Sequence, residues 1–207
     1  MEPISQAVAT INQSLGDGRK RRCNPLLMTG RGMPLKKDVP RVESEIPDGL
    51  LARLHLLADG ERNDSMNVYG WPLYLYGPTG IGKTCAALWL VDQVPTSAYL
   101  TTDKLVDEVY RPDSIVWQMA TDWLLLVVDE IGSRSNDEDG FSWQREKAAV
   151  KRMADIREHL PTVWISNKPP KHVRRLYDDR IYSRLCSGTV IRMEGVDRRF
   201  VDREADE

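Results

Sequence analysis

The sequence of 207 residues predicts an α/β fold in three layers, with a parallel sheet of five strands covered by helices on both faces. Three observations lead to this prediction. Short apolar runs alternate with segments whose apolar residues recur at helical spacing. One apolar run enters a glycine-rich turn that leads directly into a helix. Another is apolar over its whole length and ends in two acids, which is typical of a strand buried on both faces.

The elements follow one another in a regular order from Asp48 onward. Leucines at helical spacing predict a helix that begins near Asp48 and ends at Gly60. Apolar runs bounded by turn residues predict strands over 71–77, 96–101, 123–130, 162–166 and 189–195. Helical spacing predicts helices over 84–94, over 103–110 with Asp103 as the cap, over 141–160, and over 169–188 with an early proline and Gly188 at the end. Strands that alternate with helices favour parallel pairing.

Residues 1–47 are expected to form an arm, partly disordered, that precedes a single domain over residues 48–207. Apolar residues at helical spacing predict a short helix over 5–15 of the arm. The rest of the arm is rich in glycine, proline and charge and indicates a loop or linker. Its basic cluster, GRKRRC, is either a solvated linker or a contact for phosphate or a partner.

The composition is that of a globular protein, with 41% hydrophobic residues, 29% charged residues and a net charge of -2. Any contact with DNA must therefore come from local basic patches. The cysteines at 23, 85 and 186 stand singly, which indicates neither a disulfide framework nor a zinc site. No apolar run is long enough to span a bilayer and no secretion signal begins the chain, so we expect a cytoplasmic protein without a membrane partner.

The stretch GPTGIGKT, residues 77–84, fits the phosphate-binding pattern G-x-x-x-x-G-K-[ST] without departure. Its glycines let backbone N–H groups turn toward phosphate oxygens, and the helix that follows offers its positive N-terminal end. We expect Lys83 to reach the terminal phosphates and Thr84 to place its hydroxyl on Mg²⁺. A P-loop site for ATP and Mg²⁺ is therefore predicted, with the binding residues Gly77, Pro78, Thr79, Gly80, Ile81, Gly82, Lys83 and Thr84.

The buried run LLLVVDE ends in Asp129 and Glu130, two acids that are costly at a strand end unless a positive group meets them. In a P-loop fold we expect this strand to lie beside the first strand, so that Asp129 lies near Thr84 and completes the Mg²⁺ shell. Glu130 is then placed to orient or deprotonate a water that attacks the γ-phosphate. This favours hydrolysis over phosphoryl transfer to a small molecule. The alternative is that the two acids only cap a following turn.

Two further sets of polar residues follow. Asn167 comes directly after the next predicted strand, where its amide could hold the attacking water, although alone it would indicate only a turn. Arg180 and Arg184 share one face of a predicted helix. They either form a solvated charged face with Asp178 and Asp179, or one of them reaches the nucleotide of an adjacent subunit. The second alternative implies a head-to-tail oligomer, hence a ring or a spiral.

Together these motifs resemble the AAA+ ATPases, and within them the DnaC/IstB group of helicase loaders and transposon helper proteins. The similar stretches are GPTGIGKT, YLTTDKLVDEV, DWLLLVVDEIG, REHLPTVWISN, DDRIYSRLCSG and RMEGVDRRF. The resemblance implies Walker A for residues 77–84, Walker B for Asp129 and Glu130, sensor 1 for Asn167, the arginine finger for Arg184 with Arg180 beside it, and sensor 2 for Arg199 or Arg198. The chain ends soon after its last predicted strand, so we expect it to lack the C-terminal helical lid of most AAA+ proteins, as that group does.

The leading functional hypothesis is an ATP-switched loader that delivers a replicative helicase onto single-stranded DNA. The alternatives are an ATPase helper of a transposase on duplex DNA, a small-molecule kinase, and a module that holds ATP without turnover. Basic residues that could contact DNA phosphates are Arg111, Arg134, Lys168, Lys171 and the GRKRR patch. Only RPDSIVWQMATD separates the predicted helix 103–110 from the strand that follows, whereas related loaders have a longer helical insertion there.

Overall fold

The computed structural model describes residues 52, 54, 70–94, 97–111, 113–133 and 141–197. Residues 52 and 54 are helical, in agreement with the helix expected after Asp48. The predictions for the arm over 1–47, for the GRKRR patch within it, and for Arg134, Arg198 and Arg199 lie outside the described residues.

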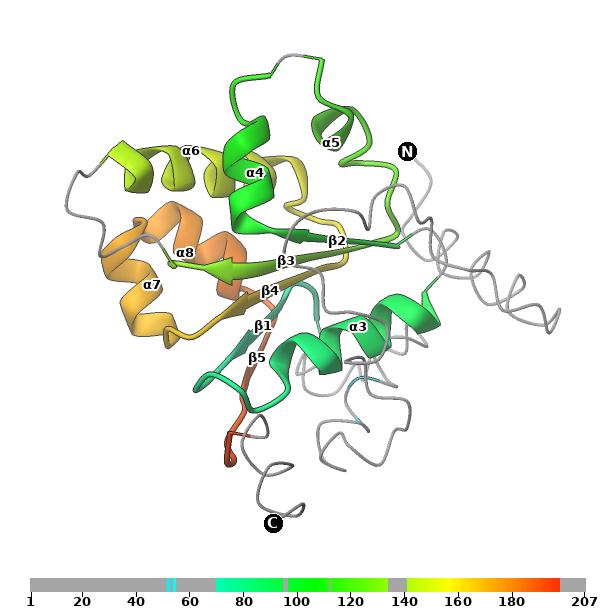
Figure 1. Ribbon diagram of the computed structural model, residues 1–207, viewed down its shortest axis with the longest axis vertical. Coiled ribbons are helices and arrows are strands. Elements are labelled where there is room, and N and C mark those ends of the chain that lie inside the picture. The colour runs from blue at the N-terminus through cyan, green and yellow to red at the C-terminus, as the bar shows by residue number, and fades with distance from the viewer. Residues whose placement is uncertain are drawn as a thin grey trace, which may run out of the picture.

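A parallel sheet of five strands forms the centre of the described chain (Figure 1). Its strands are β1 (Leu73–Tyr76), β2 (Ser97–Thr101), β3 (Leu125–Ile131), β4 (Thr162–Ser166) and β5 (Thr189–Arg192). They lie in the order β2-β3-β4-β1-β5, and each neighbouring pair runs parallel. The predicted five-stranded parallel sheet is confirmed. All strand ends that carry candidate site residues therefore lie at one edge of the sheet.

The expectation that the third predicted strand lies beside the first is wrong, because β4 lies between β1 and β3. Leu75 of β1 pairs with Ile165 of β4, and Trp164 of β4 pairs on its other side with Val128 of β3. The chain first crosses from β1 to the β2 edge and then returns strand by strand toward β1. This spatial order depends on the crossover connections, which the sequence of elements along the chain does not specify.

Helices cover both faces of the sheet, so the predicted three layers are confirmed (Figure 1). The helices are α3 (Lys83–Gln93), α4 (Thr102–Glu108), α5 (Ile115–Gln118), α6 (Phe141–Ile156), α7 (Pro170–Leu176) and α8 (Asp179–Cys186). Strand side chains alternate between two cores. Leu75 and Ile165 belong to the core under α3, whereas Tyr74 and Trp164 belong to the core shared with α4 to α8. None of these described helices is long and apolar enough to cross a membrane.

The single helix predicted over 169–188 is instead two helices, α7 and α8, separated at Tyr177 and Asp178. The Asp178 carboxylate accepts a hydrogen bond of 2.9 Å from the backbone N–H of Ile181 and so caps α8. Aspartate stabilises a helix at the N-cap more than in the interior, which explains why the chain begins a second helix here. Tyr177 is thereby left at the junction, with its side chain buried.

Three smaller differences concern the other helices. Thr101, rather than Asp103, caps α4 by accepting a hydrogen bond from Lys104 N, and Asp103 lies in the first turn. The short helix α5 was not predicted, because four residues are too few to show a period. Helix α6 ends at Ile156, four residues before the predicted end at Leu160, and the buried Arg157 follows it.

Candidate active site

The turn between β1 and α3, residues 77–82, contains three glycines in conformations that glycine favours. Gly77, Gly80 and Gly82 have positive φ angles of 148°, 80° and 92°, which residues with a Cβ rarely adopt. Gly77 also has no room for a side chain, since a Cβ there would lie 2.2 Å from the carbonyl oxygen of Met193. Gly82 is the N-cap of α3 and has no side chain that could take the place of an anion there.

Lys83 begins α3, and its ammonium group turns back into this loop. Its side chain is 7% exposed, and Nζ donates hydrogen bonds to the carbonyl oxygens of Gly77 at 3.0 Å and Pro78 at 2.6 Å. A cation held inside the loop fits the predicted contact with terminal phosphates. The residues present therefore fit a polyphosphate.

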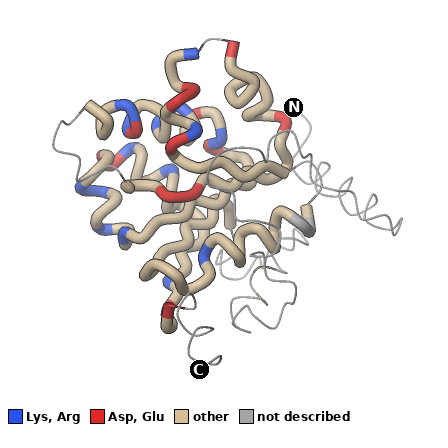
Figure 2. Tube along the Cα trace, in the orientation of Figure 1, with Lys and Arg blue, Asp and Glu red and all other residues tan. Residues whose placement is uncertain are grey.

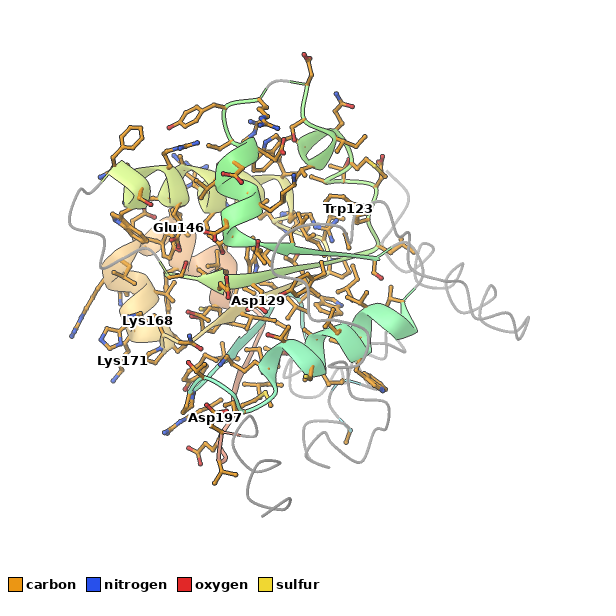
Figure 3. The ribbon with its side chains drawn as sticks, viewed as in Figure 1. Trp123, Asp129, Glu146, Lys168, Lys171 and Asp197 are labelled. Atoms are coloured by element: carbon orange, nitrogen blue, oxygen red, sulfur yellow. The ribbon has the colours of Figure 1, made fainter. Side chains whose placement is uncertain are left out.

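An acid that the sequence analysis did not single out lies against the same loop. Asp197 follows β5, and a Cβ on Gly80 would lie 1.8 Å from its Oδ1 atom (Figure 3). A carboxylate in this place opposes the binding of an anionic ligand, because like charges repel most strongly where water is partly excluded. The sequence does not indicate this contact, because Asp197 and Gly80 are far apart along the chain and meet only in the fold.

The acid at the end of β3 connects the phosphate loop with the sheet. The Thr84 hydroxyl donates to Asp129 Oδ2 at 2.6 Å, so these two predicted metal-binding residues lie in contact. Tyr99 OH donates to the same oxygen at 2.9 Å, and the backbone N–H of Glu130 donates to Oδ1 at 2.7 Å. Asp129 is 5% exposed, and these donors satisfy its buried charge.

These oxygens are a partial set of ligands for Mg²⁺, which prefers hydroxyl, carboxylate and phosphate oxygens. In the ranges that the structure describes, no group of three or more His, Cys, Asp or Glu side chains could hold a metal ion. A Mg²⁺ ion at Thr84 and Asp129 would therefore need further oxygens from a nucleotide and water. The residues fit a metal that is bound together with a nucleotide.

Glu130, the other predicted acid, projects from an irregular part of β3. Its φ angle is 67°, and the pairing of β3 with β4 shifts register between Val128 and Ile131. A glutamate held in the left-handed region indicates local strain, which proteins tolerate mainly at functional sites. Partial burial, together with the charges of Asp129 and Asp103, raises the pKa of Glu130 above its ordinary value. A carboxylate with a raised pKa is a stronger base for taking a proton from water.

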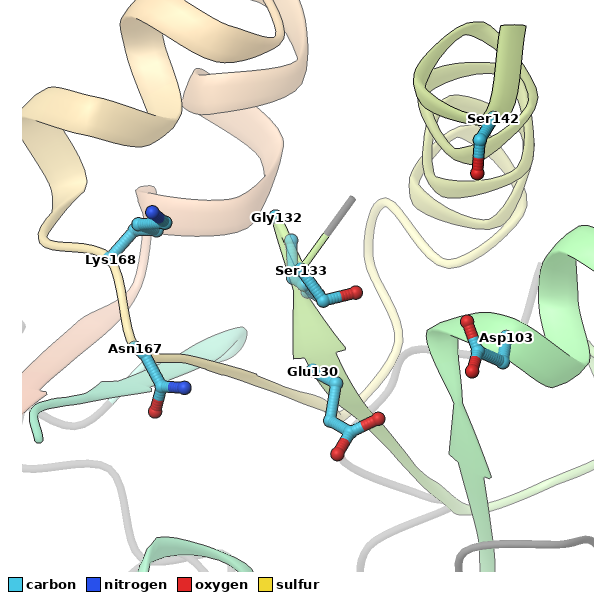
Figure 4. A pocket seen from close by; sticks show the side chains of 8 residues that line it. Asp103, Glu130, Gly132, Ser133, Ser142, Asn167 and Lys168 are labelled. Atoms are coloured by element: carbon cyan, nitrogen blue, oxygen red, sulfur yellow. The ribbon is translucent and has the colours of Figure 1, made fainter. Parts of the chain in front are cut away.

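Glu130 and Asn167 line one cavity of about 720 Å³ at the carboxyl edge of the sheet. Figure 4 shows their side chains projecting from the ends of β3 and β4, with Asp103 facing them from α4. Lys168 and Ser142 belong to the same lining. The structure therefore brings Glu130 and the predicted sensor Asn167 to one space large enough for water and part of a ligand.

Buried hydrogen bonds hold the backbone that follows Glu130. The Ser166 hydroxyl donates to the carbonyl oxygen of Ile131 at 2.6 Å. The backbone N–H of Gly132 donates to Glu146 Oε1 at 2.7 Å and lies 3.0 Å from the Tyr177 hydroxyl oxygen. Nothing in the sequence marks Glu146 or Tyr177 as site residues, because each meets Gly132 only in the folded chain.

The structure pairs Arg180 and Arg184 with Asp155 at the end of α6 and Glu158 just after it. Arg184 is 14% exposed, and its guanidinium group lies 2.8 Å from Asp155 and 2.9 Å from Glu158. Arg180 is 63% exposed, and its contact with Asp155 is longer, at 3.9 Å. The alternative that these arginines pair with Asp178 and Asp179 is wrong: the last two pair with Lys147 and Arg174.

The described candidates for DNA contact differ in their surroundings. Arg111 is exposed but lies 3.4 Å from Glu108. Lys168 lines the cavity, and Lys171 is exposed at the start of α7 (Figure 3). Figure 2 shows basic positions along α7 beside the acidic end of β3. The charges on this side are mixed, so electrostatics alone do not define a nucleic-acid surface.

Two exposed aromatic residues that the motifs did not include lie near Arg145: Tyr110, shortly after α4, and Phe141, the first residue of α6. Tyr110 and Phe141 are 66% and 65% exposed. The guanidinium carbon of Arg145 lies 5.4 Å from the centre of the Tyr110 ring and 5.9 Å from that of Phe141. Proteins that bind single-stranded nucleic acids stack bases on aromatic side chains of this kind.

No family model and no curated protein matches this chain, but solved structures do. It is similar to the DnaC helicase loader, with a TM-score of 0.53 and 10% identity, over 70% of this chain and 88% of that one. It is similar to DnaI with a TM-score of 0.53 and 17% identity, over 73% of this chain and 83% of that one. It is also similar to domain III of the replication initiation protein DnaA from Thermotoga maritima, with a TM-score of 0.50 and 19% identity, over 73% of this chain and 63% of that one. The chain spans 48% of the length of a similar DNA replication initiation factor.

At these identities the similarity concerns the fold. In this chain the shared fold consists of the five-stranded parallel sheet and the helices on its two faces. The described part of this chain therefore shares its fold, a five-stranded parallel sheet between two layers of helices, with these replication proteins.

Proposed function

We propose that this protein is a Mg²⁺-dependent ATPase that loads a replicative helicase onto single-stranded DNA. The observation that carries the nucleotide part is the hydrogen bond of 2.6 Å between Thr84 Oγ1 and Asp129 Oδ2. It joins the helix after the phosphate loop to the strand end that carries Glu130. One site thus has a phosphate cradle, oxygens for a metal and a carboxylate exposed to a cavity, which are the parts that nucleotide hydrolysis requires.

Each residue has a defined task in this proposal. Residues 77–84 bind the phosphates, and Lys83 neutralises part of their charge from within the loop. Thr84 and Asp129 hold Mg²⁺, which supplies further positive charge to the phosphate oxygens when it is bound. Glu130 accepts a proton from the attacking water or orients it, and Asn167 holds that water from the other side of the cavity. Water activation favours hydrolysis over transfer to a small acceptor.

Assembly of several subunits completes the site. An arginine of the neighbouring subunit would stabilise the charge of the transition state, and head-to-tail contacts of this kind lead to a ring or spiral. Arg184 and Arg180 are the candidates, and their positions differ: Arg184 must leave Asp155 and Glu158, whereas Arg180 is mostly exposed. Arg199, or Arg198, is proposed to contact the nucleotide as sensor 2.

Three observations support DNA and a helicase as partners. This chain covers 88% of the similar DnaC helicase loader. A DnaA structure of TM-score 0.50 is described as bound to AMPPCP and single-stranded DNA. In this chain itself, the exposed rings of Tyr110 and Phe141 lie beside the half-buried Arg145, and exposed aromatic rings can bind single strands by stacking without reading sequence.

Capture of the ATP-bound assembly tests the proposal. Glu130→Gln should bind ATP, hydrolyse it slowly and retain the replicative helicase from the native cell, whereas Lys83→Ala should bind neither ATP nor helicase. Recovery of a transposase in place of the helicase would contradict the loader role. Wild-type protein that releases no phosphate from ATP in the presence of Mg²⁺ and single-stranded DNA would contradict the ATPase itself. Transfer of phosphate to a small acceptor, undiminished in Glu130→Gln, would support the kinase alternative.

A further inference from the structure

Glu146 is an acid in the interior of the protein. It lies on α6, its side chain is 0% exposed, and its helix neighbours Ala149 and Val150 belong to the apolar core. Figure 3 shows it between α6 and the sheet, on the face opposite α3. A buried carboxylate destabilises a protein unless hydrogen bonds compensate its charge, so its partners show what it does.

The partners of Glu146 lie beside the candidate catalytic acid. Its Oε1 atom accepts a hydrogen bond of 2.7 Å from the backbone N–H of Gly132, two residues after Glu130. The same oxygen accepts a short hydrogen bond from the Tyr177 hydroxyl. Burial and the nearby Glu146 raise the pKa of Tyr177 well above its ordinary value, so the hydroxyl keeps its proton and donates it. A charged acceptor with two donors is a strong and directional contact.

The segment that Glu146 holds has an unfavourable backbone conformation. Glu130 has φ 67°, which is strained for a residue with a Cβ, whereas Gly132 has φ 79°, which glycine adopts without strain. The β3–β4 pairing is irregular at this point. Strained conformations of this kind persist only when their surroundings fix them. Here Ser166 fixes the carbonyl of Ile131, and Glu146 fixes the N–H of the next residue.

We propose that Glu146 is a positioning residue, which holds the segment Glu130–Gly132 in the conformation that directs Glu130 into the cavity. Tyr177 assists by fixing the Glu146 carboxylate. The inference rests on the proposed ATP hydrolysis, in which Glu130 acts on the attacking water. Loss of the contact would let the segment relax toward an extended strand and move Glu130 away from the water. The phosphate loop would be unchanged, because it leads into α3 on the opposite face of the sheet from Glu146.

Four variants of the full chain test this inference. Glu146→Leu removes the acceptor at similar volume, and Glu146→Gln keeps an oxygen that can accept both hydrogen bonds. Tyr177→Phe removes only the hydroxyl. Glu108→Gln is the matched control, because Glu108 is also a buried glutamate, 6% exposed, but lies on α4 and pairs with Lys104. For each variant we would measure the single-turnover rate of ATP hydrolysis, the Kd of a fluorescent ATP analogue and the melting temperature.

The proposal predicts a specific pattern. Glu146→Leu should lower the hydrolysis rate by about 10- to 100-fold, as misplacement of a catalytic group does, and change the nucleotide Kd by less than about twofold. Glu146→Gln should restore the rate to within about threefold of wild type, Tyr177→Phe should lower it several-fold, and Glu108→Gln should leave it unchanged. In a Glu130→Gln background, Glu146→Leu should cause no further loss, since it acts through Glu130.

Other outcomes overturn the inference in distinguishable ways. If Glu146→Leu hydrolyses ATP at the wild-type rate, or slows the Glu130→Gln protein by the same factor as the wild type, Glu146 does not position Glu130. If Glu146→Leu does not fold, Tyr177→Phe decides: a wild-type rate for that variant contradicts the proposal. If the wild-type protein does not hydrolyse ATP, the proposed function fails as well. An inactive Glu130→Gln beside a fully active Glu146→Leu overturns the positioning role alone.

Discussion

The hydroxyl of Tyr99 is expected to stabilise both the fold and the metal site, and Tyr99→Phe tests this. The ring is 4% exposed, and its OH donates to Asp129 Oδ2 at 2.9 Å. Burial, and then the charge of Asp129, raise the pKa of Tyr99 far above its ordinary value, so the hydroxyl remains a donor throughout the usual pH range. The substitution removes one oxygen atom and keeps the ring that packs in the core under α3.

The structure sets the size of the effect. A hydrogen bond to a charged acceptor contributes about 1.5–3 kcal/mol, so the free energy of unfolding should fall by about 2 kcal/mol. In a chain of this size, each kcal/mol corresponds to about 2–4 °C, which predicts a melting temperature lower by about 4–8 °C. Asp129 would keep Thr84 as a donor to Oδ2 but would be less fixed in orientation. We therefore expect the Mg²⁺ concentration for half-maximal ATP hydrolysis to rise by about tenfold.

Calorimetry of a double-mutant cycle provides the assay. Tyr99→Phe, Asp129→Asn and the double variant would be melted without nucleotide, and Mg²⁺ would be titrated in the hydrolysis assay for Tyr99→Phe. If the hydroxyl acts on the carboxylate, its removal should cost less in the Asp129→Asn background than in the wild type. An equal cost in both backgrounds, or a melting temperature within 1 °C of wild type, would show that this contact does not hold Asp129.

Three further predictions concern other contacts. Asp197→Asn should tighten ATP binding by about fivefold in a fluorescence titration, because it removes an anion from the phosphate loop; weaker binding would contradict this. Arg157→Lys should lower the free energy of unfolding by about 3 kcal/mol in urea denaturation, since a buried guanidinium donates to the carbonyls of Ala120, Trp123 and Pro161; an unchanged midpoint would contradict it. Tyr110→Ala should weaken single-stranded DNA binding by about tenfold without affecting ATP affinity, and an unchanged DNA affinity would exclude stacking there.

The strands were predictable because their signal is local. The run TVWIS was predicted as a strand over 162–166, and β4 has these bounds, since apolar β-branched and aromatic residues between turn residues favour a strand buried on both faces. The order of the strands was not predictable in the same way. The position of β4 between β1 and β3 depends on how far each crossover travels across the sheet, and no residue within a strand encodes it.

The same distinction applies to the site. Residues 77–84, and the acids Asp129 and Glu130, form continuous motifs, and the structure brings Thr84 and Asp129 into contact. Tyr99 and Glu146 were missed because each becomes a site residue only through a partner on another element. In the sequence, Tyr99 is one aromatic residue of a strand and Glu146 one charge of an amphipathic helix, where an acid normally faces water. Their hydrogen bonds exist only in the folded chain.

The break between α7 and α8 connects these observations. Asp178 caps α8, the helix that carries Arg184, and the preceding residue, Tyr177, contacts Glu146 and Gly132 with its hydroxyl. A continuous helix over 169–188 would have needed no cap at Asp178, and the sequence pattern favoured it because both helices have apolar residues at compatible spacing. The polar residues at the junction therefore have two roles in one place: Asp178 begins the second helix, and Tyr177, through Glu146, supports the segment that contains the candidate catalytic acid.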